Sequence, residues 1–138
     1  MEVTNQLSPS PERMGEFFGP DAPDSPFVMV NLLKFKDQAE YADGRDTDLS
    51  GREAYALYGA AVRKLIDELG GRSIYSGPVT GLMLGEVDEL WDMVALVEYP
   101  NSAAFQAMVT SEAYQAAHVH RDAGLAGQLN IRTQEGAF

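Results

Sequence analysis

The sequence predicts an α+β fold with its elements in the order β-α-β-β-α-β. Segments with apolar side chains at helical spacing separate runs rich in β-branched and aromatic residues, which is the pattern of strands joined by helical crossovers. This order is that of the ferredoxin-like fold, in which helices cover one face of a four-stranded antiparallel sheet. The strand-like runs are residues 27–35, 72–87, 91–99 and 125–133.

The composition fits one globular domain and excludes several function classes. The chain has 138 residues, of which 45% are hydrophobic, and a formal net charge of −11. This acidic excess disfavours nucleic acid and anionic membranes as partners, because both attract Lys and Arg. The absence of cysteine excludes disulfides, thiolate metal sites and cysteine nucleophiles. Since a basic leader and an apolar run of roughly 20 residues are both missing, we expect a cytoplasmic protein.

Residues 1–26 are expected to form an N-terminal arm, and residues 27–138 the ferredoxin-like domain. Five of the seven prolines lie in the arm. Ser10 is a suitable N-cap for a short helix with Pro11 and Glu12 in its first turn. We expect the apolar side of this helix to pack on the main body or on another subunit.

The first strand, residues 27–35, is apolar along most of its length, which is typical of burial on both faces. The acid-rich segment that follows, residues 36–49, contains Asp43, Asp46 and Asp48. Their spacing does not match an EF-hand, so a solvated loop is favoured over a calcium site. No metal site is expected here.

A capping box, Ser50-Gly-Arg-Glu53, predicts the start of the first main helix. Gly70 and Gly71 predict its end near Leu69. One face of this helix carries an apolar and aromatic stripe, formed by Tyr55, Tyr58, Val62, Leu65, Ile66 and Leu69.

The second half of the chain is predicted to complete the fold. The second strand region, residues 72–87, is interrupted at Gly77-Pro78, because proline cannot donate to a strand ladder. After the third strand, one short helix begins near Ser102, and a second runs from about Glu112 to Asp122.

The sheet is expected to have one face that no helix covers. The first and third strands supply apolar side chains to it, and so large an apolar patch is unusual for a monomer. Two sheets that pair across a two-fold axis bury the patch. We therefore expect a homodimer.

One helix face near the C-terminus carries candidate catalytic groups. Tyr114, Ala117, His118 and Arg121 recur at the i, i+3, i+4 and i+7 positions. His118 would accept a proton near neutral pH, and Arg121 would bind an enolate or carboxylate oxygen. The alternative is that Arg121 pairs with a carboxylate of the third strand, and that His118 caps a helix or is exposed.

Asn31 and several aromatic residues are candidate ligand-binding groups. Asn31 interrupts an apolar strand and needs partners if it is buried; it would orient a ligand carbonyl or satisfy a bulge or a dimer seam. The aromatic residues would line a pocket or simply form core. These aromatic residues are Tyr55, Tyr58, Tyr75, Trp91, Phe105 and Tyr114.

Two carboxylates of the third strand, Asp92 and Glu98, are too far apart to be a glycosidase pair. On a strand they are separated by about 20 Å, whereas such pairs lie roughly 5–10 Å apart. Salt bridges are the favoured interpretation. Motifs of metalloproteases, serine hydrolases and nucleotide-binding loops are absent from the sequence.

Several of these segments together are similar to one known family. Over roughly residues 26–133 the chain resembles the uncharacterised domain-of-unknown-function family 1330, which implies the dimeric α+β barrel superfamily and no established activity. The segments that carry this resemblance are Pro26–Phe35, Gly70-Gly71-Arg72, Trp91-Asp92 with the strand to Val97, Glu98-Tyr99-Pro100, Tyr114, Arg121 and Leu125.

The superfamily implied by this resemblance includes cofactor-independent monooxygenases, haem-degrading monooxygenases, chlorite-dismutase-like proteins and lactone isomerases. The segment Ser111–His118 is similar to a helix of the haem degraders, whose histidine ligates iron beside an asparagine of the first strand. His118 and Asn31 stand at these places. Met108 stands where the haem degraders carry tryptophan, which argues against haem degradation.

Three functions follow as hypotheses. The leading one is a homodimer that binds a small carbonyl, phenolic or lactone compound and performs cofactor-free proton transfer or oxygenation, with monooxygenase-like or isomerase-like chemistry. In it His118 is the base, and Arg121 and Asn31 lie beside the oxyanion. The second is a non-catalytic ligand-binding or interaction scaffold, and the third is a haem-binding or haem-degrading monooxygenase.

Overall fold

The computed structural model describes residues 1–22 and 24–136. Its strands form one antiparallel sheet in the order β2-β3-β1-β4, so that β1 and β3 are central and β2 and β4 are the edges. The strands are β1 (Phe27–Phe35), β2 (Arg72–Pro78), β3 (Met93–Tyr99) and β4 (Leu125–Thr133).

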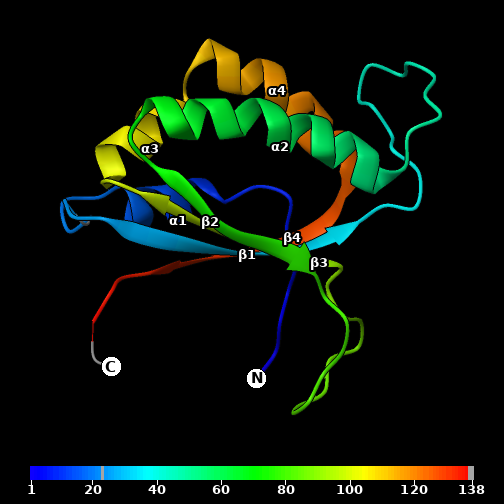
Figure 1. Ribbon diagram of the computed structural model, residues 1–138, viewed down its shortest axis with the longest axis horizontal. Helices are drawn as coiled ribbons and strands as arrows, with labels where there is room; N and C mark the ends of the chain where they lie inside the picture. The colour runs from blue at the N-terminus through cyan, green and yellow to red at the C-terminus, as the bar shows by residue number, and fades with distance from the viewer. Residues whose placement is uncertain (23, 137–138) are drawn as a thin grey trace.

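Helices α2, α3 and α4 lie together on one side of the sheet (Figure 1). The order of the elements after α1 is the predicted β-α-β-β-α-β, with the second helical crossover divided into α3 and α4. Within the described ranges, no helix is both long enough and apolar enough to cross a membrane. The helices are α1 (Pro11–Phe17), α2 (Gly51–Glu68), α3 (Ser102–Val109) and α4 (Glu112–Gly124).

Local hydrogen bonds place the helix ends where the sequence predicts them. The hydroxyl of Ser50 accepts from the amide of Glu53, and the Glu53 carboxylate accepts from the amide of Ser50, so the capping box is confirmed. Ser10 likewise caps α1. After α2, Gly70 has a φ of 88°, a left-handed conformation that glycine adopts without steric cost.

The second strand is shorter than the sequence predicts. It ends at Pro78 rather than near Val87, because proline has no amide hydrogen with which to continue the ladder. Residues 79–92 instead form a loop that hangs below the sheet in Figure 1. The third strand correspondingly begins at Met93 and not at Trp91.

The core lies between the helices and the face of the sheet that they cover, which we call the covered face. Phe27 of β1 forms a buried cluster with Val62 and Ile66 of α2. Leu33 of β1 and Leu125 of β4, each 0% exposed, form another. Burial of such side chains is the main favourable term in folding.

The opposite side of the sheet, which we call the open face, carries apolar side chains that no described helix covers (Figure 1). Residues paired directly across antiparallel strands point to the same side. Tyr75 and Ile131 on this face are 56% and 46% exposed. The apolar residues of the open face are Val28, Val30, Leu32, Tyr75, Val94, Leu96, Leu129 and Ile131.

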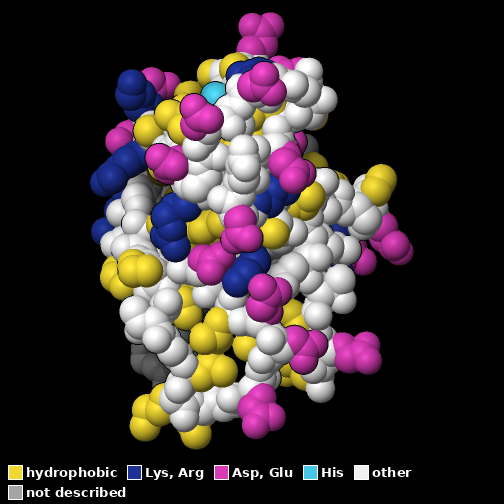
Figure 2. Space-filling view, turned by 90° about the vertical axis from the view of Figure 1, so that its right-hand side faces the viewer, with side chains coloured by type: hydrophobic (Ala, Val, Ile, Leu, Met, Phe, Trp, Pro, Cys, Tyr) yellow, Lys and Arg dark blue, Asp and Glu magenta, His cyan; other side chains and the backbone are white. Residues whose placement is uncertain are grey.

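The loop of residues 79–92 lies on the side of the open face and is also apolar at its surface. Leu82, Met83 and Leu84 are 50%, 98% and 85% exposed. In Figure 2 hydrophobic side chains gather in the lower half of the molecule, which is the level of this loop in Figure 1. The open face and the loop together leave a large apolar surface on the protomer.

The N-terminal arm packs against the domain of the same chain. Gln6 and Gln128 of β4 exchange two backbone hydrogen bonds of 3.1 and 3.0 Å, so the arm briefly extends the sheet at its β4 edge. Farther along, the ring of Phe17 in α1 lies 6.2 Å from that of Phe27 and 5.8 Å from that of Phe105.

Candidate functional site

Helix α4 turns the predicted residues toward α2 and the sheet. It begins after Ser111, whose hydroxyl accepts a hydrogen bond from the amide of Tyr114 at 3.2 Å. Ala117 is 5% exposed and belongs to the main buried cluster, so its face of the helix points inward. Tyr114 and Arg121 share this face, and His118 lies at its border.

A chain of hydrogen bonds joins Arg121 to Asn31 through Gln128. Arg121 Nη2 donates to Gln128 Oε1 (2.7 Å), and Gln128 Nε2 donates to Asn31 Oδ1 (2.8 Å). Asn31 Nδ2 then donates to the carbonyl of Ala95 on β3 (3.1 Å). Because a guanidinium only donates, it sets the orientation of both amides. The three side chains therefore act as one unit between α4, β4 and β1.

The guanidinium of Arg121 is nearly enclosed, with 12% side-chain exposure. Its Nη1 donates to the carbonyl of Leu7 in the arm at 2.7 Å and to Oδ1 of Asp122 at 3.3 Å. Two of the three acceptors of Arg121 are thus neutral oxygens.

The carboxylates of Asp92, just before β3, and Glu98, within it, have partners of their own. Asp92 Oδ1 lies 3.3 Å from Lys34 Nζ, and Glu98 Oε1 lies 3.0 Å from Arg72 Nε. These contacts confirm the salt bridges that the sequence predicts for both residues. Arg121 pairs with neither of them.

His118 is held by Asp122 one helical turn later. Its Nδ1 lies 3.1 Å from Asp122 Oδ2, and its ring lies 5.6 Å from that of Tyr114. Burial lowers the pKa of His118 below its ordinary value of 6.5, and Asp122 opposes this change. The imidazole is therefore neutral at pH 7, and the Asp122 contact assigns the proton to Nδ1, which leaves the lone pair on Nε2.

Phenols of α2 and α4 lie beside this histidine. The hydroxyls of Tyr58 and Tyr114 are 3.0 Å apart, and the rings of Tyr55 and Tyr58 are 5.2 Å apart. Burial raises the pKa of Tyr55 to about 12, and burial together with Tyr114 raises the pKa of Tyr58 well above 10.0. Tyr55 and Tyr58 are neutral at pH 7 and serve as hydrogen-bonding and stacking groups.

The structure does not bring the remaining three predicted aromatic residues, Tyr75, Trp91 and Phe105, to the phenols. Tyr75 lies on the open face of the sheet. Phe105 stacks with the rings of Tyr99 (4.5 Å) and Phe18 (5.8 Å) in the core beneath α3. Trp91, near the end of the loop of residues 79–92, donates its indole N–H to Asn5 Oδ1 at 2.7 Å.

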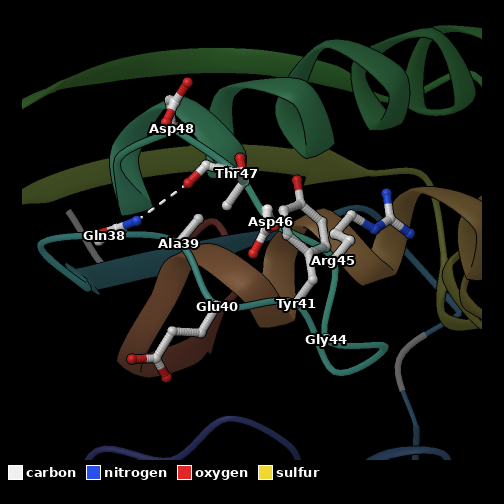
Figure 3. Close-up of a pocket in the computed structure, with 9 residues that line it drawn as sticks. All are labelled: Gln38, Ala39, Glu40, Tyr41, Gly44, Arg45, Asp46, Thr47 and Asp48. Carbon is white, nitrogen blue, oxygen red and sulfur yellow. Dashed lines mark hydrogen bonds between the residues drawn. The ribbon is translucent and has the colours of Figure 1, made fainter.

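A second cluster joins α4 to the loop between β1 and α2. The hydroxyl of Tyr41 lies 2.7 Å from His120 Nδ1, and the guanidinium of Arg45 lies 4.5 Å from the Tyr41 ring. An open cavity of about 570 Å³ is formed by this loop, with Gln38 donating to the carbonyl of Thr47 at 3.1 Å (Figure 3).

This loop cavity has no sign of a metal centre. The carboxylates of Glu40 and Asp48 point away from each other in Figure 3. Among the described residues, no group of three or more acidic or histidine side chains could hold a metal ion. A smaller cavity of about 230 Å³ lies between the start of β1 and residues 134–135. The predicted site residues line neither cavity.

Gln128 and the carbonyl of Leu7 belong to the site but were not predicted. Gln128 is 8% exposed and connects the two predicted residues Arg121 and Asn31. The sequence does not single it out, because the last strand alternates polar and apolar residues and also carries Asn130 and Arg132. No sequence signal marks Leu7 either.

Comparison with known families identifies the chain. Residues 45–133 match the family described as "Domain of unknown function (DUF1330)". The chain belongs to this family. The resemblance predicted from the sequence is therefore confirmed. Among curated proteins, none is significantly similar to this DUF1330 protein.

Solved structures extend the comparison along the whole chain. Two crystal structures of RPA0582, one described as a protein of unknown function from Rhodopseudomonas palustris and one of its methylated form, are 31% and 33% identical to this DUF1330 protein. The former covers 97% of this chain and 99% of its own, with a TM-score of 0.85. The latter covers 98% of both chains, with a TM-score of 0.87.

More distant structures share the fold alone. A dimeric ferredoxin-like protein of unknown function from Jannaschia sp. CCS1 is 15% identical, with a TM-score of 0.54 and coverage of 80% of this chain and 99% of that one. SnoaB, a cofactor-independent oxygenase from Streptomyces nogalater, is 10% identical, with a TM-score of 0.52 and coverage of 83% and 96%. The ferredoxin-like fold predicted for this DUF1330 protein is confirmed.

The residues at the places used by haem degraders do not fit a haem. Met108 is 6% exposed and packs in the core with Phe27 and Val62. Both polar atoms of the Asn31 side chain are bonded, one to Gln128 and one to the Ala95 carbonyl.

Proposed function

We propose that this DUF1330 protein is a cytoplasmic homodimer that binds a small carbonyl, phenolic or lactone compound and moves a proton on it without a cofactor. The ligand lies against the phenols of Tyr55, Tyr58 and Tyr114. His118 accepts the proton, and Arg121 holds the oxygen on which negative charge develops. This reading agrees with the fold of the protein, although fold by itself does not specify chemistry.

The pairing of His118 with Asp122 beside Arg121 is the observation that carries this proposal. Since Asp122 accepts from Nδ1 at 3.1 Å, Nε2 is the free base of a neutral imidazole. When Nε2 takes a proton from a carbon next to a carbonyl, the electron pair of the broken C–H bond moves to the carbonyl oxygen. The guanidinium of Arg121 stabilises the resulting enolate.

The next step depends on the compound. Return of the proton from the imidazolium to a different carbon completes an isomerisation and regenerates neutral His118. In a cofactor-independent oxygenation, the electron-rich carbon of the enolate or phenolate instead gives its electron pair to dioxygen, which is the oxidant. A C–O bond forms, and the resulting peroxide takes the proton from the imidazolium of His118. Both reactions use the same base and the same oxyanion partner.

The homodimer part of the proposal is supported by the open face. Its apolar side chains and those of the loop of residues 79–92 lie on one side of the protomer, and a second copy would cover both. The Jannaschia protein with the same fold is described as dimeric.

A titration with 4-nitrophenol tests the site. The ionised form of this compound is coloured, so a site that holds its oxygen on Arg121 increases the phenolate absorbance at a pH where the free compound is mostly protonated. We expect this increase with the unaltered protein and its loss in Arg121→Gln. Arg63→Gln, at an exposed arginine of α2, is the matched control and keeps it. No absorbance change with the unaltered protein would contradict the proposal.

The role of His118 has its own readout. In an NMR titration of the two histidines, we expect His118 to titrate below pH 6.5, and Asp122→Asn to lower its pKa further, because Asp122 raises this pKa. If His118 titrated above 6.5, it would be charged near neutrality and unsuited to act as the base.

A non-catalytic scaffold is the second candidate, and one observation favours it. The hydrogen-bonding groups of Asn31 and Gln128 that face each other are already paired, and Arg121 has acceptors from its own chain. In a scaffold this network only joins α4 to the sheet. If the protein is such a scaffold, we expect an intact dimer that binds neither 4-nitrophenol nor related carboxylates.

A further inference from the structure

Residues 5–7 of the N-terminal arm form hydrogen bonds around the β4 edge, close to Arg121. On the helix side of the β4 edge, the Leu7 carbonyl accepts from Arg121 Nη1 at 2.7 Å. Gln6 forms an antiparallel β-bridge with Gln128 of β4 through backbone hydrogen bonds. Asn5 then accepts from the Trp91 indole at 2.7 Å. Residues 5–7 therefore clasp the β4 edge at the point where Arg121 meets the sheet.

This clasp is attached weakly. Met1 to Ser10 are all exposed, so the arm buries no apolar side chain there. Among the described residues, four hydrogen bonds hold residues 5–7: two at Gln6 and one each at Asn5 and Leu7. Segments with exposed hydrogen bonds and no buried apolar contacts open at low cost in free energy.

The hydrogen-bond acceptors of Arg121 indicate which kind of group could replace the Leu7 carbonyl of the clasp, that is, of residues 5–7. The guanidinium is only 12% exposed, yet its two shortest bonds, to Leu7 and Gln128, go to neutral oxygens. Asp122 is 48% exposed, lies farther away at 3.3 Å, and is shared with His118. A charge-assisted bond to an anionic oxygen is roughly twice as strong as a neutral one, so an anion at the place of the Leu7 carbonyl is favoured.

We infer that the Leu7 carbonyl occupies the acceptor place of a ligand's anionic oxygen on Arg121, and that binding of a carboxylate, enolate or phenolate releases residues 5–7 from the β4 edge. This inference rests on the proposed function, since it assumes that Arg121 is the oxyanion partner. It adds that the site selects anionic over neutral carbonyl compounds. A neutral amide or ester gains no charge-assisted bond with which to displace the Leu7 carbonyl.

Gly127 offers a way to loosen the clasp without altering the site. A Cβ at this position would lie 2.7 Å from the Cβ of Asn5, so only glycine permits the arm to pass there. Because residues along a strand alternate between its faces, Gly127 and Gln128 point to opposite sides. Gly127→Ala therefore pushes away the arm and leaves the Gln128 side chain in place.

Benzoate and its neutral counterpart benzamide are the probes. With the unaltered protein, we expect benzoate to bind and to speed amide hydrogen exchange in residues 1–10, and benzamide to do neither. In Gly127→Ala the arm is open more of the time, so benzoate should bind about threefold to tenfold more tightly. Gly59→Ala is the matched control, because its Cβ meets nothing within 4 Å, and it should leave the affinity unchanged.

Asn5→Ala is a second variant in case the altered strand folds poorly. It removes the acceptor of Trp91 and should also tighten benzoate binding, by a smaller factor. One outcome overturns the inference and leaves the proposed function intact. In it, benzoate binds through Arg121 with equal affinity in all arm variants, and amide hydrogen exchange in residues 1–10 does not change. Failure of both benzoate and 4-nitrophenol to bind any variant overturns both.

Discussion

The two faces of the sheet carry similar apolar side chains in very different surroundings. Leu33 and Leu32 are neighbours on β1, yet Leu33 lies under the helices at 0% exposure, and Leu32 lies on the open face, partly exposed. The strand itself does not distinguish them, because both faces of β1 are apolar. The difference comes from the connections between the strands. The helical crossovers α2, α3 and α4 all lie on one side of the sheet, and no described helix covers the other side.

Replacement of these two leucines gives the largest expected difference. Leu33→Ala should lower the free energy of unfolding by about 2–5 kcal/mol, since it leaves a cavity in a closed core. Leu32→Ala should cost less than about half as much, and its effect should grow with protein concentration because it acts through the dimer. Urea unfolding at two protein concentrations measures both. Equal and concentration-independent costs would contradict the comparison.

A charge on the open face should separate the dimer. Leu96 pairs with Val30 and lies in the middle of this face. Leu96→Asp should raise the dissociation constant more than about 100-fold, because the carboxylate would be buried in the interface without a partner. Sedimentation velocity reports the change. Leu57→Asp, at a residue of α2 that is 47% exposed, is the control and should leave the dimer unchanged.

Removal of one phenol hydroxyl tests the polar contact between the two helices that pack above the covered face, α2 and α4. Tyr58→Phe or Tyr114→Phe should each cost about 1–2 kcal/mol, because each leaves the other hydroxyl without the partner now 3.0 Å away. The double variant should cost less than the sum of the two. Strict additivity in this double-mutant cycle would show that the hydroxyls do not interact.

The smallest expected effect is a pH dependence from His118 of α4, which lies above the covered face. The pKa of His118 is lower in the folded protein than its ordinary 6.5. Between these two values the unfolded chain binds the proton and the folded protein does not, so stability rises with pH through this window and levels off above 6.5. His118→Gln should flatten that rise in a series of urea titrations, whereas a steeper rise would reverse the assigned direction.

Helix ends and strand positions were predictable because they depend on near neighbours. The capping box of Ser50 and Glu53, the stop at Gly70 and the strand from Phe27 to Phe35 all match the structure within a residue or two. The second strand was predicted too long, because the apolar residues Leu82 to Leu84 were assigned to a sheet and lie exposed in a loop. An apolar run in the sequence predicts burial, but it does not show that the residues are buried in a sheet of the same protomer.

The candidate site was predictable only in part. Helical spacing brought Tyr114, His118 and Arg121 to one region, and the polar interruption at Asn31 marked a residue that is joined to Arg121. The bridging residue Gln128 was overlooked, because the last strand alternates polar and apolar residues and its sequence does not distinguish Gln128 from Asn130 or Arg132. Trp91 and Phe105, selected as aromatic residues alone, lie apart from the phenols because their partners are Asn5 and the core rings.

The sequence alone determined the order of the elements, the helix caps and the need to cover an apolar sheet face, since periodicity and capping act over a few residues. Only the tertiary structure decided the partners of Arg121. Leu7 and Arg121 are 114 positions apart, and they meet because β4 returns to the edge of the sheet where the arm begins. Such a contact depends on how the whole chain folds back, which neither spacing nor residue type encodes locally.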